Sequence, residues 1–190
     1  KTWEEKPFNG REFVEKKLSP IKLEMLGFRA PKAGDNDEIV MQMCASLLSN
    51  ENSTGLLDKL TLDHKLLASM AFYMPYNDLG QFVILAIPKI IGQKLEDAEK
   101  MVLEQIDRLR KGEFSDELLQ TIKLELYRQM TTELETNEGK AMMLAEMIGQ
   151  QRNVEEIYEI PKRIMSVTKQ EIMNAAQKYL NGNYLAFYSR

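Results

Sequence analysis

The side chains best suited to chemistry are scarce in this chain, which holds one histidine, His64, and one cysteine, Cys44. A thiol and an imidazole can act as nucleophile and general base when they lie within hydrogen-bond reach, and this pair is the one such arrangement that the composition allows. Cys44, however, falls inside an apolar helical stripe, where a thiol usually serves as a small buried hydrophobe. We therefore predict no catalytic residue, and the Cys44–His64 pair is the alternative to be tested.

Metal and cofactor chemistry is equally poorly represented. A structural zinc site needs several converging His, Cys, Asp or Glu ligands, and a single His and a single Cys exclude its standard forms. No segment has the spacing of a calcium-binding loop, a phosphate-binding loop, a dinucleotide-binding glycine fingerprint or a Gly-x-Ser-x-Gly elbow. We predict no metal ligand and no cofactor in this chain, although a site made of carboxylates alone stays open.

The composition bounds the class of protein. The chain has 190 residues, of which 44% are apolar and 28% charged, as in an ordinary globular domain with a sizeable core. Its net charge of −4, without a basic cluster, argues against nucleic-acid binding. No apolar run is long enough to span a bilayer, so we expect no membrane span. The first residues, KTWEEKPFNG, show neither an initiator Met nor a signal-peptide pattern, and we expect a fragment of a longer chain.

The elements that would position any site can be read from periodicity and turn signals. Alternating apolar residues predict a strand over 21–30, and a helical stripe with acidic residues at its start predicts a helix over 36–49. The turn cluster PYNDLG between two apolar runs predicts a hairpin over 66–74 and 81–88. Further helices are expected at 55–62, at 95–111 before Gly112, after the cap Ser115, from 141, over 154–167 around Pro161, and at 169–180 behind a Thr168–Glu171 capping box.

The order of these elements, with a last strand over about 183–189, predicts an α+β fold. The hairpin argues against a purely parallel sheet, so we expect helices layered on one face of a mostly antiparallel sheet. Residues 1–19 are charged and are expected to form a linker or a lead-in helix. Residues 20–190 are expected to form a single domain.

Several segments, in order, resemble one domain of the pitrilysin/insulinase family of zinc metallopeptidases, which includes the mitochondrial processing peptidases. IKLEMLGFRAPKAGDNDEIVMQMCASLLSN is similar to the family's strand, acidic turn and first helix, and STGLLDKL to its Leu-rich second helix. NDLGQFVILAIPK resembles an Asp-x-Gly-x-Phe strand entry, and EDAEKMVLEQIDRLRKGEFSDELLQTIK a helix pair cornered by a Gly. SVTKQEIMNAAQKYLNGNYLAFYS resembles the closing helix and strand. The likeness extends from about residue 19 to residue 189.

The resemblance implies a chain that is not itself catalytic. In the family, one domain carries an inverted zinc motif, His-x-x-Glu-His, on its first helix, together with a distal Glu ligand, and the Glu of the motif activates the zinc-bound water. Here that helix, 36–49, has no His, and its one Glu, Glu38, precedes the stretch Val40–Ala45, which has none. Some zinc-free domains supply an Arg and a Tyr that grip the substrate, and the matching positions are Thr61 and Ala68. Substrate-binding residues therefore remain unassigned.

The resemblance thus implies a zinc-free structural or chamber-lining domain of a larger zinc metalloendopeptidase. Its expected partners are a catalytic domain, in the same chain or in a separate subunit, which would hold the zinc, and a peptide substrate in the shared chamber. Two alternatives stay open: a protein-interaction or scaffold module from an inactive member of the family, and an autonomous hydrolase. The compartment is not determined, and only the resemblance favours the periplasm or cell envelope.

Overall fold

The fold is built around one five-stranded sheet. The computed structural model describes residues 6–18 and 20–189. Within them the strand order is β1-β5-β2-β4-β3, and every neighbouring pair is antiparallel except β1 and β5, which run parallel. The strands are β1 (Arg11–Lys16), β2 (Leu23–Ala30), β3 (Ala68–Pro75), β4 (Gly80–Ile87) and β5 (Tyr184–Ser189). The expected mostly antiparallel sheet is confirmed.

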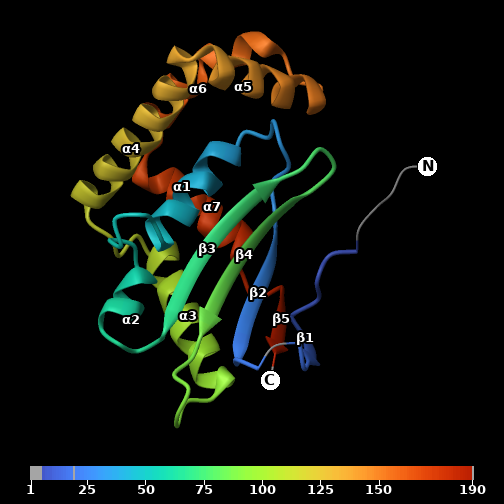
Figure 1. The fold of residues 1–190 in the computed structure, drawn as a ribbon, viewed down its shortest axis with the longest axis vertical. Helices are drawn as coiled ribbons and strands as arrows, with labels where there is room; N and C mark the ends of the chain where they lie inside the picture. The colour runs from blue at the N-terminus through green and yellow to red at the C-terminus, as the bar shows by residue number, and fades with distance from the viewer. Residues whose placement is uncertain (1–5, 19, 190) are drawn as a thin grey trace.

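The helices gather on one side of this sheet (Figure 1). α1 packs against β3 and α7, and α3 packs against β2, β4 and α7. The α+β fold with helices on one face is therefore confirmed. The helices are α1 (Glu38–Leu48), α2 (Asp58–Leu62), α3 (Leu95–Arg110), α4 (Asp116–Glu135), α5 (Asn137–Gly149), the 3-10 helix η1 (Val154–Tyr158), α6 (Ile160–Ser166) and α7 (Lys169–Tyr179).

Helix boundaries follow the capping signals. The Ser115 hydroxyl accepts a hydrogen bond from the Leu118 amide at 3.1 Å, and Thr168 and Glu171 form the predicted capping box at the start of α7. The helix expected over 154–167 is two elements, η1 and α6, because Pro161 occupies the first turn of α6, where its missing amide hydrogen costs nothing. In the described part of the chain, no helix is both long and apolar enough to cross a bilayer.

The segment before β2 differs from the expectation. A linker or lead-in helix was predicted for residues 1–19, but Arg11–Lys16 form strand β1, paired with β5 over Arg11↔Tyr184 to Lys16↔Ser189. The apolar residues Phe13 and Val14 are next to each other and suit either periodicity, so tertiary pairing decides the outcome. Residues 1–5 and 19 lie outside the described residues.

The two faces of the sheet have different environments. Residues of the helix-covered face are fully buried, among them Leu26, Phe28, Phe82 and Ile84. The opposite face, which we call the open face, is also largely apolar, and no helix of residues 6–18 and 20–189 covers it (Figure 1). Strand register places one apolar residue from each strand in a row across all five: Val14, Phe187, Met25, Leu85 and Met70.

This arrangement reverses the simplest interpretation of the β2 pattern. Ile21, Leu23 and Met25 alternate with polar residues, and they would be expected to face the core. In the structure Glu24 is fully buried under the helices, whereas Met25 faces the open side. The strand is predicted correctly, but the apolar residues of this alternation lie on the uncovered face.

Candidate functional site

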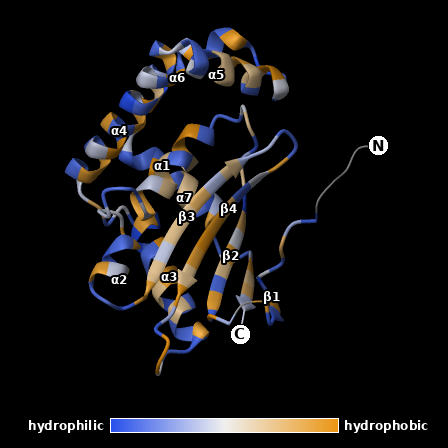
Figure 2. Cartoon of the chain, in the orientation of Figure 1, coloured by the Kyte–Doolittle hydropathy of each residue, from blue (hydrophilic) through white to orange (hydrophobic). Residues whose placement is uncertain are grey.

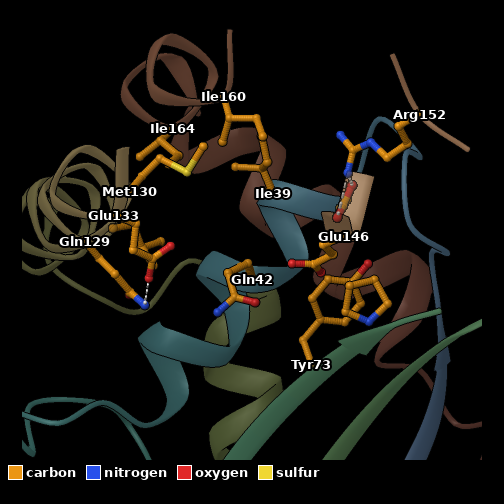
Figure 3. Close-up of a pocket in the computed structure, with 13 residues that line it drawn as sticks. Ile39, Gln42, Tyr73, Gln129, Met130, Glu133, Glu146, Arg152, Ile160 and Ile164 are labelled. Carbon is orange, nitrogen blue, oxygen red and sulfur yellow. Dashed lines mark hydrogen bonds and ion pairs between the residues drawn. The ribbon is translucent and has the colours of Figure 1, made fainter. Parts of the chain in front are cut away.

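The first candidate site is the place on α1 where the family resemblance puts a zinc motif. A cavity of about 370 Å³ lies between α1, the end of β3 and an arm formed by α4, α5 and α6 (Figure 3). Its apolar lining includes Ile39, Met130, Ile160 and Ile164. Its polar lining comprises Glu38, Gln42, Tyr73, Gln129, Glu133, Glu146 and Arg152.

Several polar groups of the cavity are engaged in hydrogen bonds, with one another or with groups outside it. Arg152 donates to Glu38 at 3.0 Å and to Glu156 at 3.3 Å, and Glu38 also accepts from the Gly34 amide at 2.8 Å. The Tyr73 hydroxyl donates to the Pro31 carbonyl at 2.8 Å. Burial has the largest effect on Tyr73 and raises its pKa. Nearby carboxylates, first among them Glu38, raise this pKa further. None of the residues that line this cavity is a recognisable activated nucleophile.

The metal ligands of an inverted zinc motif have no counterpart on α1. Of its residues in the Val40–Ala45 stretch, only Gln42 faces solvent and lines the cavity, and the others are buried in the core. Amide, thioether and alkyl groups do not fit the His and carboxylate ligand set that zinc prefers. Across residues 6–18 and 20–189, no three His, Cys, Asp or Glu side chains converge as a metal site.

The two residues most open to a catalytic interpretation lie in unlike surroundings. Cys44 is fully buried, its thiol donates to the Ile172 carbonyl at 3.9 Å, and burial raises its pKa, which disfavours the reactive thiolate. His64 lies on an exposed turn after α2 in the left-handed backbone region, with φ of 54°. No hydrogen bond joins the two side chains within the part of the chain that the structure describes. This geometry does not support a dyad.

Thr61 and Ala68, the positions matched to the substrate-gripping pair, lie near each other in the fold without forming a site. The Thr61 hydroxyl is 3.2 Å from the hydroxyl of Ser69, which donates to the Leu57 carbonyl. Ala68 begins β3. Their side chains have neither the guanidinium nor the phenol that gripping a peptide would require, and here they belong to the junction between α2 and β3.

A buried charged network was not foreseen from the sequence. Glu99 of α3 accepts from Arg11 at 2.6 Å and from the hydroxyls of Tyr184 and Tyr188 on β5. Burial alone would raise the pKa of Glu99, but these hydrogen bonds hold it below its usual value. The four residues come from β1, α3 and β5, so no local motif in the sequence joins them.

Glu24 lies next to this network and is itself fully buried. Neither of its carboxyl oxygens has a hydrogen-bond partner among the described residues. Burial, and then the negative charge of Glu99, raise its pKa to about 9, against the opposing effect of Arg11. Glu24 is therefore a neutral acid at pH 7. In the sequence, Glu24 shares the alternation of Leu26 and Phe28, which are buried under the helices, and this was the one signal that could have revealed it.

Comparison with known proteins agrees with this geometry. A family model described as the peptidase M16 inactive domain matches residues 2–126. The zinc protease PqqE of Helicobacter pylori is 23% identical over 158 residues, which cover 81% of this chain and 34% of that protein.

Solved structures show the same fold. A protease from Helicobacter pylori superimposes with a TM-score of 0.87 at 17% identity, covering 97% of this chain and 45% of that one. The peptidase M16 inactive domain from Pseudomonas fluorescens gives a TM-score of 0.77 at 15% identity, covering 94% and 42%. The chain thus spans about a third of the curated relative and less than half of these two structures. The resemblance to a non-catalytic pitrilysin-type domain is confirmed, and the chain belongs to the peptidase M16 inactive-domain family.

Proposed function

We propose that this chain is the zinc-free domain of a larger zinc metallopeptidase and that it packs, through its open face, against the domain that holds the zinc. The chain would complete that half of the enzyme and line part of the chamber in which a peptide is held. Zinc and the catalytic water belong to the partner domain. The single observation that carries this proposal is the open face.

The open face has the character of an interface. Strand β4 contains FVILAI, a continuous apolar run that is typical of a strand buried on both sides. Figure 2 shows β3 and β4 coloured largely apolar. On the edge strand β3, Met70 and Phe72 are 46% and 45% exposed. Together with the row of apolar residues across all five strands, these exposed side chains form a contiguous apolar surface, and such surfaces mark partner contacts when they are large.

The length of the relatives suggests what covers it. The curated relative is about three times as long as the matched segment, and the Helicobacter pylori structure is about twice as long. A second domain of the same protein, or a separate subunit, is therefore the occupant that we propose. Gly27 lies on this face with no atom within 4 Å of the position that a Cβ would take, so a side chain of the partner can approach the β2 backbone there.

The test is reconstitution with the neighbouring domain. The coding sequence that flanks this chain should contain a His-x-x-Glu-His domain, and that domain, produced separately, should bind the chain in size-exclusion chromatography with light scattering. Leu85→Glu lies in the middle of the open face and should abolish the complex. Leu124→Glu is the matched control because Leu124 is 52% exposed on α4.

The outcomes separate the competing functions. If no zinc-motif domain flanks the chain and no zinc-bearing subunit co-purifies with it, the proposal is wrong and a scaffold module is the better account. If the complex forms but Leu85→Glu leaves it intact, a partner exists but the open face is not its docking surface.

A further inference from the structure

The loop between β4 and α3 forms an exposed apolar tip. Ile90 and Ile91 are 75% and 88% exposed, the highest values among the large hydrophobic side chains that the structure describes. The loop is the lowest point of the view in Figure 1, and Figure 2 colours part of it as strongly apolar. Two adjacent β-branched side chains that are this exposed bury little surface within the domain, so they are available for an external contact.

The tip is held in place by a polar side chain behind it. Gln93 accepts a hydrogen bond from the Lys89 amide at 2.6 Å and donates to the Lys65 carbonyl at 3.0 Å. Lys22 donates to the Gln93 carbonyl at 3.5 Å. Gly92, with φ of +81°, supplies the left-handed residue that reverses the chain. The two isoleucines therefore project from a fixed turn.

The same hydrogen bonds gather lysines around the tip. Four lysines lie in or next to the segments that these hydrogen bonds connect to Gln93: Lys22, Lys65, Lys89 and Lys94. The acidic groups nearby are Asp63, which is 3.6 Å from Lys65, Asp97, which accepts from the Lys94 amide, and Glu96 beside Lys22 and Lys94. Asp63 pairs with Lys65, and Asp97 bonds only to a backbone amide, so the four lysines outnumber the three carboxylates by one and the rim of the apolar tip carries a small positive excess.

We propose that this tip binds an anionic lipid surface, with Ile90 and Ile91 entering the boundary between headgroups and acyl chains and the lysines contacting lipid phosphates. A lipid fits better than a protein partner because two projecting side chains offer far less area than the roughly 800 Å² per partner of a standard protein interface. Membrane-surface binding needs only a small buried apolar area together with positive charge. This inference does not depend on the zinc-free role proposed above.

The test is co-sedimentation with vesicles of phosphatidylcholine alone and vesicles containing phosphatidylglycerol, using the chain and its full-length parent. Both should bind the anionic vesicles more tightly than the neutral ones. Lys89→Gln with Lys94→Gln should weaken that binding at least tenfold, since each lysine near an anionic surface contributes about fivefold. Ile90→Ser with Ile91→Ser should reduce binding to both kinds of vesicle.

Two matched pairs separate the tip from other exposed apolar groups. Met142→Ser with Ile148→Ser removes residues of comparable exposure, 69% and 65%, from α5. Met70→Ser with Phe72→Ser removes exposed residues of the open face, which could adsorb to lipid by itself. Both pairs should leave binding unchanged. The proposal is overturned if the wild-type chain ignores anionic vesicles, or if loss of binding follows either of these pairs rather than the tip.

Discussion

Replacing Glu24 by Gln should change how the stability of this domain depends on pH. Glu24 is fully buried without a hydrogen-bond partner among the described residues, and its pKa is raised from the ordinary 4.5 to about 9. The folded chain therefore holds a proton that the unfolded chain releases at neutral pH. For such a group the free energy of unfolding falls as the pH rises between the two pKa values, and the effect is absent below the lower one.

The magnitude follows from the size of the shift. Each pH unit between the two pKa values lowers the free energy of unfolding by about 1.36 kcal/mol. The contribution of Glu24 to this free energy therefore falls by about 3 kcal/mol from pH 6 to pH 8. A Gln side chain has nearly the same shape but does not titrate. Its amide adds a cost that is constant with pH. The stability of Glu24→Gln minus that of the wild type should therefore increase by about 3 kcal/mol over this range.

The assay is urea unfolding followed by circular dichroism at several pH values. Glu104→Gln is the matched control, because Glu104 lies exposed on α3, the helix that also carries Glu99, and its curve should run parallel to that of the wild type. Parallel curves for Glu24→Gln and the wild type between pH 6 and pH 8 would refute the reasoning, since they would mean that Glu24 is ionised in the folded state.

Substitutions at three further positions, with Gly27→Ala as a control for one of them, test other parts of the fold. Arg11→Gln should lower the free energy of unfolding by about 2 kcal/mol, because it leaves Glu99 buried without its counter-charge. The 38% exposure of the Arg11 side chain keeps this loss moderate. In urea titrations the loss should shrink toward acid pH, as Glu99 becomes protonated. Gly80→Ala should lower the free energy of unfolding by about 3 kcal/mol in the same titrations, because a Cβ would lie 1.7 Å from the Pro31 carbonyl oxygen. Gly27→Ala, on the open face, is the control and should leave the free energy of unfolding nearly unchanged. Thr168→Ala should lower the thermal midpoint by removing the α7 cap, a loss of about 1 kcal/mol.

Local signals in the sequence predicted most of the elements. Helix caps at Ser115 and Thr168, the hairpin turn and the helical stripes act over a few residues, and the structure has the corresponding helices and strands. The segment around β1 was not predictable in this way, because it becomes a strand only through pairing with β5 at the other end of the chain. Its partner is distant in sequence, so no local pattern specifies it.

The candidate site shows the same division. The lack of a zinc motif on α1 is visible in the residues alone. The Arg11–Glu99 network and the cavity beneath α4 and α6 depend on how separate elements meet, and the sequence gives no indication of them. Met25 shows a subtler division: the alternation predicts the strand over 21–30, but which side of the strand the helices cover depends on how they pack, and Met25 lies on the uncovered face.

The most direct test of the central claim is methionine oxidation footprinting of the open face. Met25, Met70 and Met74 lie on that face, and the fully buried Met41 and Met43 provide an unreactive reference. In the isolated chain, peroxide should oxidise the three open-face residues readily, as mass spectrometry of the peptides would reveal. In the full-length parent protein they should be as protected as the two reference residues. Equal oxidation in the isolated chain and in the parent would contradict the claim that this face packs against a neighbouring domain.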